Sequence, residues 1–245
     1  MNASVIKKLN ELNHEFYEKV SDSFSETRQQ PWAGWTELLP ILKAHISQNS
    51  PIVLDIGCGN GRFALFLKKN FPSADFFYYG EDSSQKLLDL AEQSLQKHLI
   101  PPNFQVTNRD FLDKPPAIEA DIITLFGVLH HVPSKELRIQ KIQECADALL
   151  PGGILIFTAW QFDQLKNVFE RRVSAEKVGL HQNDLEDGDY LLTWERGVPA
   201  IRYCHLTTQD EIAEIVSQSG LQLVTQFVAD GPNNSTNEYV VLQKI

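Results

Sequence analysis

A run of apolar residues that ends in three alternating glycines is the feature that most constrains the fold of this chain. Residues 52–56 read Ile-Val-Leu-Asp-Ile, and Gly57, Gly59 and Gly61 follow before a helix-like segment begins at Arg62. An apolar run of this length is typical of a parallel strand that is buried on both faces. Glycines between a strand and a helix let the backbone turn tightly and approach a ligand closely. The segment therefore predicts a binding site for a nucleotide-like cofactor.

Downstream of this loop the chain alternates between strand and helix patterns, which implies a parallel sheet with helices on both faces. The last two strands have no helix between them and should pair antiparallel at the sheet edge. We therefore predict an α/β fold with a Rossmann-like, doubly wound sheet of seven strands. It should be mostly parallel, with an antiparallel C-terminal edge strand. The further strands are predicted at 76–79, 104–107, 121–126, 154–159, 221–228 and 238–243, and helices at 85–98 and 135–150.

Two regions lie outside the alternation. Residues 1–50 should form an N-terminal helical cap, with an amphipathic helix from Val5 to Val20, a polar loop at 21–31 and a second helix at about 35–46. Residues 161–206 are polar and irregular, with one helical candidate at 162–177. They follow the strand predicted at 154–159, which a turn at 151–153 precedes. We expect this second region to be an insertion, or lid, over the active site. Residues 1–245 should otherwise form a single domain.

The composition narrows the class of protein. The net charge is −10, which disfavours non-specific binding to nucleic acid because that depends on an excess of Lys and Arg. Cys58, Cys145 and Cys204 are scattered without a CxxC pair, so we expect reduced thiols and no metal site. No apolar stretch approaches the roughly 20 residues of a membrane span. A cytoplasmic protein without membrane contact is therefore expected.

The spacing of the glycines discriminates between cofactors. A dinucleotide fingerprint, G-x-G-x-x-G, needs its third glycine at the position of Arg62, so a dehydrogenase is disfavoured. The D-x-G-x-G-x-G of residues 55–61 resembles instead the first motif of the S-adenosylmethionine-dependent methyltransferases with a Rossmann-like fold.

This resemblance implies a set of cofactor contacts. In that family an acidic residue after the second strand holds both ribose hydroxyls, and Asp82 fits its Gly-x-Asp-x-Ser spacing better than Glu81 does. The aspartate after the third strand contacts the adenine amino group, and the end of the fourth strand lies beneath the methionine part. The cofactor-binding residues implied are Asp55, Gly57, Cys58, Gly59, Asp82, Ser83, Asp110, Phe111 and Phe126.

The residues just after the fourth strand constrain the acceptor. Methylases of amino nitrogens often carry Asn/Asp-Pro-Pro-aromatic there, whereas residues 126–129 read Phe-Gly-Val-Leu. That subclass is disfavoured. A carboxylate acceptor needs no base because it is already ionised at neutral pH, but it needs cations, preferably arginine in a bidentate grip.

Three further segments carry a more specific resemblance. They are Phe-Ser-x-Thr-Arg-x-x-Pro-Trp at 24–32, Val-x-His-His at 128–131 and Arg-Tyr-x-His at 202–205. Together they resemble the eukaryotic-type tRNA methyltransferases that esterify the 5-carboxymethyl group of a wobble uridine. The resemblance implies tRNA as substrate and a small zinc-binding activator subunit as partner. It further implies Arg28, His130, Arg202 and His205 as catalytic residues, with Tyr17 and Trp32 closing the acceptor pocket.

Several alternatives stay open. Cys204 and Ala33 depart from the family pattern, and the candidate basic patch of Lys166, Arg171, Arg172 and Lys177 is modest. The acceptor could therefore be a small-molecule carboxylate or another metabolite, and a non-catalytic module that binds the cofactor is a further possibility. His205 could be a hydrogen-bonded core histidine, and one residue of the His130–His131 pair could be structural.

Overall fold

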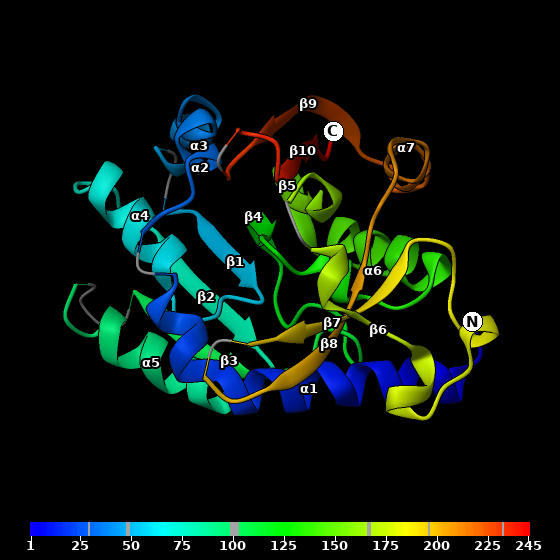
Figure 1. The fold of residues 1–245 in the computed structure, drawn as a ribbon. Helices are drawn as coiled ribbons and strands as arrows, with labels where there is room; N and C mark the ends of the chain where they lie inside the picture. The colour runs from blue at the N-terminus through cyan, green and yellow to red at the C-terminus, as the bar shows by residue number, and fades with distance from the viewer. Residues whose placement is uncertain (29, 48–49, 99–102, 166–167, 196, 232) are drawn as a thin grey trace.

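A seven-stranded sheet forms the centre of the computed structural model, which describes residues 1–28, 30–47, 50–98, 103–165, 168–195, 197–231 and 233–245 (Figure 1). Its strand order is β3-β2-β1-β4-β5-β10-β9, with the first five strands parallel and β10 antiparallel to both of its neighbours. The predicted doubly wound fold with an antiparallel C-terminal edge is confirmed. The strands are β1 (Ile52–Ile56), β2 (Phe77–Asp82), β3 (Phe104–Asn108), β4 (Ala120–Leu125), β5 (Leu149–Trp160), β9 (Gln222–Ala229) and β10 (Asn237–Gln243).

Helices cover both faces of this sheet, as the apolar run of β1 requires. Val53 packs in one buried cluster and its neighbour Leu54 in the other, because successive side chains of a strand point to opposite faces. The Val53 face is covered by α2 (Gly34–Glu37), α3 (Leu39–Ile46), α4 (Arg62–Asn70) and α5 (Gln85–Leu95), and the Leu54 face by α6 (Lys135–Ala148) and α7 (Gln209–Gln218).

The N-terminal helix is longer than the sequence pattern predicted. Helix α1 (Ala3–Glu26) runs across one end of the sheet, and the expected loop at 21–31 begins only after it (Figure 1). Ser21 and Ser25 continue the buried stripe of the helix beyond Val20. Their small side chains fit against the protein without an apolar signal, and for that reason the hydrophobic pattern missed them.

The region 161–206 is a small antiparallel sheet rather than a helix-bearing loop. Its strands are β6 (Arg172–Val173), β7 (Asp189–Trp194) and β8 (Ala200–His205), in that order. The helix predicted at 162–177 is wrong: short 3₁₀ turns flank β6 at Phe162–Gln164, Phe169–Arg171 and Ala175–Val178. Phe162 and Val168 pack against Leu192 and Cys204 of the small sheet, so tertiary contacts outweigh the local spacing. Lys166 lies outside the described residues.

Smaller differences concern single turns. The expected turn at 151–153 lies within β5, where Leu149 pairs with Ala120 and Ile154 already pairs with Ile122, so the strand bulges. The fourth strand, predicted to end at residue 126, ends at Leu125, and a 3₁₀ turn, η1 (Leu129–His131), follows it. Within the described part of the chain, no helix has the length and apolar character that a membrane crossing requires.

Candidate active site

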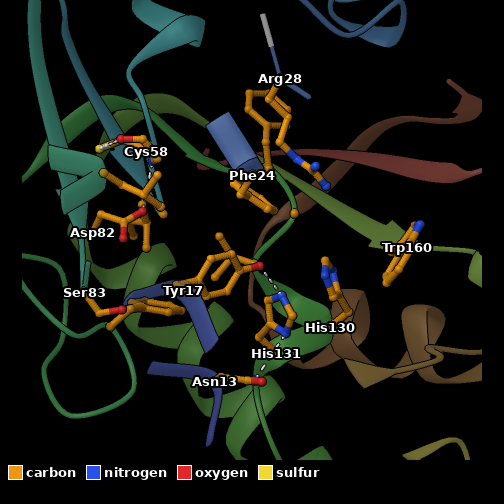
Figure 2. A pocket seen from close by; sticks show the side chains of 18 of the residues that line it. Asn13, Tyr17, Phe24, Arg28, Cys58, Asp82, Ser83, His130, His131 and Trp160 are labelled. Carbon is orange, nitrogen blue, oxygen red and sulfur yellow. Dashed lines mark hydrogen bonds between the residues drawn. The ribbon is translucent and has the colours of Figure 1, made fainter. Parts of the chain in front are cut away.

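A cavity of about 480 Å³ lies where β1, β2 and β4 end, and α1 and β8 also contribute to its walls (Figure 2). In open α/β sheets, ligands bind outside the carboxyl ends of the strands where the strand order reverses, as it does here between β1 and β4. Of the residues predicted to form the site, all but His205 line this cavity. The structure therefore gathers residues from six separate segments into one place.

The glycine loop adopts a conformation that other residues would strain. Gly57, Gly59 and Gly61 all have φ between 55° and 75°, the left-handed region. A Cβ on Gly57 would lie 2.3 Å from Cγ2 of Val128, so this glycine is needed for packing. A Cβ on Gly59 would meet no heavy atom within 4 Å, so this glycine leaves cavity space to a ligand. The backbone amides of Gly57 and Cys58 donate to the carbonyl of Glu81, which fixes the loop against β2.

The carboxylate of Asp82 lies beside this loop. It accepts hydrogen bonds from the backbone N–H of Gly59 and of Ser84, each at 2.9 Å. A carboxylate has about four acceptor positions, so two remain for the hydroxyls of a sugar. Glu81 does not line the cavity, because its carboxylate accepts from the backbone N–H of Ala117 instead. The choice of Asp82 over Glu81 thus agrees with the geometry.

The far end of the cavity, beyond Asp82, is apolar with a polar rim. Phe111 and Leu87 supply apolar surface, and Asp110 supplies a carboxylate that accepts from the N–H of Leu112 at 2.8 Å. Asp110 also accepts from Nδ2 of Asn10 on α1 at 3.0 Å. Such walls suit a flat base with hydrogen-bond donors on its edge.

Asp55 lies at the floor of the cavity and is almost completely buried. Its two carboxylate oxygens accept from the hydroxyls of Tyr78 and Thr124, both at 2.7 Å. Burial raises the pKa of Asp55 to about 6, partly offset by these two hydrogen bonds. These two hydrogen bonds link β1 to β2 and β4 directly beneath the glycine loop.

Aromatic rings form one wall. Phe126 lies 4.8 Å from Phe63 and 6.2 Å from Trp32 between ring centroids, and Trp35 packs within the same cluster. Trp35 is buried and Trp32 is only partly buried, and both line the cavity. Arg62, at the position of the missing third glycine, lies over both tryptophan rings at 5.2 Å.

Two arginines line the opposite end. Arg28 follows α1 and stacks on Phe24, with its guanidinium carbon 3.7 Å from the ring centroid (Figure 2). Arg202, on β8, is only 9 % exposed and its guanidinium lies 4.8 Å from the ring of Trp160 and 5.4 Å from that of Phe16. Within the described residues no carboxylate pairs with Arg202. A nearly buried cation without a counter-ion is costly unless a ligand supplies the negative charge.

The two adjacent histidines differ in their surroundings. Nδ1 of His131 lies 2.8 Å from the carbonyl oxygen of Tyr203, so this nitrogen carries the proton and donates it. Nε2 therefore accepts from the hydroxyl of Tyr17 at 2.7 Å, and the 3.3 Å contact of Nδ1 with Asn13 is not a hydrogen bond in this tautomer. His131 is thus a structural link between α1, η1 and β8. His130 lines the cavity beside Trp160, with a buried Nδ1 that has no partner in the described structure.

The two histidines and Tyr17 at this end of the cavity are weak acid–base groups at neutral pH. Burial, together with the charges of Arg202 and Arg28, lowers the pKa of His131 to about 3. Burial and the neighbouring His131 hold the pKa of His130 well below its usual value. Burial raises the pKa of Tyr17 to about 12. At pH 7 both imidazoles are neutral and the phenol keeps its proton.

His205 is the predicted site residue that the structure places elsewhere. Side chains alternate along β8, so Arg202 faces the cavity while Tyr203 and His205 face away from it. Nδ1 of His205 lies 2.7 Å from Asp189 and Nε2 2.9 Å from Glu211. These two carboxylates raise the pKa of His205 despite its burial. The expectation of a catalytic His205 is replaced by a structural role, since it holds the small sheet to α7.

The sequence analysis missed several residues that line the cavity. Asn10, Asn13 and His14 come from α1, Phe24 from its last turn and Trp160 from the end of β5. A faint signal existed in α1, because Asn10, Asn13 and Tyr17 recur at helical spacing beside the apolar stripe. The local sequence does not specify that these residues line the cavity, because their position depends on the packing of α1 across the end of the sheet.

The known proteins that are similar to this chain are methyltransferases. A family model described as a methyltransferase domain matches residues 24–226. The tRNA (carboxymethyluridine(34)-5-O)-methyltransferase ALKBH8 of Mus musculus is 30% identical over 172 residues, which are 70% of this chain and 23% of that protein. The tRNA (carboxymethyluridine(34)-5-O)-methyltransferase of Schizosaccharomyces pombe is 29% identical over 63% of this chain and 60% of its own length. The chain thus matches less than two thirds of each of these relatives.

Solved structures support the fold. The CcbJ methyltransferase of Streptomyces caelestis superposes with a TM-score of 0.65 over 93% of this chain and 96% of its own, at 16% sequence identity. At that level of identity the likeness concerns the fold alone.

Proposed function

We propose, since the chain belongs to the methyltransferase domain family, that it methylates the carboxylate of a carboxymethyl group on the wobble uridine of tRNA. Its cofactor is S-adenosylmethionine, which supplies an electrophilic methyl group on a positively charged sulfur. The residues of the cavity fit this molecule. Gly59 leaves room for it, Asp82 has free acceptor positions, and Phe111 offers an apolar surface for its base.

The cofactor roles follow from the order of these groups along the cavity. Asp82 holds the ribose hydroxyls, and Asp110 together with Phe111 and Ser83 surrounds the base. Asp55 and the loop of Gly57 to Gly59 support the other end of the nucleoside. Phe126 lies toward the arginine end through its contact with Trp32, so it belongs beneath the methionine part.

The observation that carries the choice of acceptor is the combination of two arginines with two histidines whose lowered pKa makes them weak bases. Arg28 and Arg202 supply positive charge where an anion can be held, and arginine binds carboxylates in a bidentate manner. A carboxylate attacks a methyl group without first losing a proton, so the lowered pKa of His130 and of His131 is no obstacle. An alcohol acceptor would need a stronger base than these histidines to remove its proton.

The role of Tyr17, Trp32 and His130 is then to position the donor and the acceptor rather than to transfer a proton. Tyr17 is fixed by its hydrogen bond to His131, which points its ring into the cavity between the two ends (Figure 2). Holding donor and acceptor in line and excluding water are the main tasks of a protein in such a displacement. Trp32 closes one wall, and His130 forms the wall beside Trp160.

We assign the region 161–206 as the acceptor-side lid of a single domain, with residues 1–50 as the helical cap. Arg202 on β8 and Leu165, just after the turn at Phe162–Gln164, bring this region to the cavity wall. The aromatic contacts of Arg202 with Phe16 and Trp194 join the lid to α1. Both regions therefore meet over the proposed acceptor.

The test is methyl transfer from labelled S-adenosylmethionine to bulk tRNA and, separately, to a metabolite extract. Label should enter tRNA, and nucleoside analysis should show a base-labile methyl ester on a carboxymethyluridine. Arg28→Ala should abolish this label, whereas the surface variant Lys7→Ala, whose exposed ammonium pairs with Glu11 away from the cavity, should retain it. Label only in a metabolite would refute the tRNA assignment.

A small-molecule carboxylate is the second candidate, and two observations favour it. The net charge of −10 is unfavourable for a tRNA-binding protein, and a cavity of about 480 Å³ is large enough for a free metabolite. The two candidates share the same arginines and differ in the salt dependence of binding. Binding of tRNA should weaken steeply with salt.

We further propose that the chain works with a small zinc-binding activator subunit, as its resemblance implies. The purified chain should then bind S-adenosylhomocysteine but methylate tRNA slowly until such a subunit is added. Full tRNA methylation by the purified chain alone would remove the need for this partner.

A further inference from the structure

We propose that Asn10 of α1 reads the base of the cofactor, as a second acceptor for the exocyclic amino group of adenine beside Asp110. The inference rests on the cofactor and on the cavity assigned above, and it does not depend on the identity of the acceptor. Asn10 lines the cavity, and its Nδ2 lies 3.0 Å from Oδ2 of Asp110. The two residues are a hundred positions apart in the chain, so α1 and the segment after β3 meet at this point.

The contact with Asp110 fixes the orientation of the amide. A carboxylate only accepts hydrogen bonds, so the NH₂ group of Asn10 must face Asp110 and the amide oxygen must point elsewhere. No donor within the described residues reaches that oxygen. Oδ1 of Asn10 is therefore an open acceptor on the cavity wall, next to a carboxylate that has lone pairs of its own to offer.

The position along the cavity indicates which part of the cofactor faces this oxygen. Asp82 marks the sugar, and β2 and β3 are neighbours with Asp82 paired to Asn108, so Asp110 lies just beyond the sugar site. Leu87 and Phe111 give this end apolar walls. The opposite end holds Arg28 and Arg202 and suits an anion. The base of the nucleoside belongs between Leu87 and Phe111.

Adenine presents a donor on the edge that these acceptors can meet. Its amino group donates two hydrogen bonds, and asparagine pairs with adenine through this group in other recognition sites. With Asp110 and Asn10 both accepting, each N–H of the amino group has a partner. A base that carries hydrogen or a carbonyl oxygen at that position would lose one or both bonds.

The test measures binding of S-adenosylhomocysteine and of its 6-deamino analogue, which has hydrogen in place of the amino group, by titration calorimetry. The wild-type protein should prefer the adenine compound. Asn10→Ala should weaken it about fivefold, the equivalent of one net hydrogen bond, and should leave the analogue within twofold. The control is Glu11→Ala, an exposed neighbour in the same helical turn, which should change neither.

Three results separate the possibilities. If the wild type binds neither compound, the assigned cofactor is wrong. If Asn10→Ala weakens both compounds equally, Asn10 acts only by holding α1 in place, and the inference is overturned. Asn10→Ser is the second variant, which keeps a small polar side chain at this position. It should give the same selective loss if Asn10→Ala proves poorly folded.

Discussion

Replacing Arg202 by methionine tests the acceptor site most directly. The side chain of Arg202 is nearly buried among Phe16, Trp160 and Trp194, and no carboxylate among the described residues offsets its charge. Methionine retains much of the apolar volume and removes the charge. If the guanidinium holds the acceptor carboxylate through two hydrogen bonds, each contributes about 1.5–3 kcal/mol because charged groups are involved. The change should lower kcat/KM by about 10²- to 10⁴-fold.

The same substitution should leave the fold and the cofactor site unharmed. Removing an unpaired buried charge recovers its desolvation cost, which offsets the lost contacts with the aromatic rings. The Tm of Arg202→Met should stay within about 3 °C of the wild type, and binding of S-adenosylhomocysteine should be unchanged, since Arg202 is at the other end of the cavity from Asp110.

Arg138 provides a matched control with the opposite expectation. It is 1 % exposed, and its guanidinium donates to Glu211 at 2.6 Å and to Glu186 at 3.2 Å. Arg138→Met removes this buried guanidinium from both carboxylates, at a cost of about 3–5 kcal/mol, or about 6–20 °C in Tm. Measurement needs thermal unfolding, calorimetry with S-adenosylhomocysteine and the tRNA methylation assay. An equal loss of Tm in both variants would refute the view that Arg202 awaits a ligand.

Three further outcomes are expected. Asp82→Ala should weaken binding of S-adenosylhomocysteine by about 10²- to 10⁴-fold, while Arg28→Ala should leave that binding within threefold and stop methyl transfer; calorimetry showing the same loss in both would contradict the division of roles. Gly59→Ala should cost only about 1–2 kcal/mol of folding stability for its left-handed φ, yet should impair cofactor binding because the added Cβ enters the cavity. Burial raises the pKa of Asp55 from 3.8 to about 6, so the folded state holds this proton more tightly than the unfolded state. This contribution to the free energy of unfolding, about 3 kcal/mol, is complete below pH 4 and is lost as the pH rises through 6. Asp55→Asn should remove this fall in stability from denaturant titrations at pH 4 to 7. An unchanged fall in the variant would contradict the raised pKa of Asp55.

The local sequence was sufficient for the sheet and for one half of the site. The run at 52–56 is apolar on both faces, and only a strand between two helical layers buries both. The first four parallel strands could be placed within about three residues, whereas β5 begins at Leu149, five residues before the strand predicted at 154–159. Gly57, Gly59 and Asp82 could be assigned for a related reason: the turn after a strand is a local structure, and its residues meet through the pairing of β1 with β2.

The acceptor half depended on packing between distant segments. Nothing in the sequence Arg-Tyr-Cys-His at 202–205 says which side chains face the cavity, because a strand with both faces buried shows no polar alternation. The docking of β8 on α1 turned Arg202 inward and His205 toward Glu211. The same docking set the tautomer of His131 through the carbonyl of Tyr203. Family resemblance alone had assigned Arg202 and His205 the same role.

By itself, then, the sequence determined the layered fold, the glycine loop and the carboxylate beside it, because those features arise from local backbone geometry and from burial patterns a few residues long. Tertiary structure alone decided which buried polar groups are satisfied and which remain open to a ligand. Arg138 and His205 pair with carboxylates within the protein, whereas the guanidinium of Arg202 lies against aromatic rings and pairs with no carboxylate among the residues described. That difference follows from desolvation, since the environment of a buried charge depends on residues brought to it from everywhere in the chain.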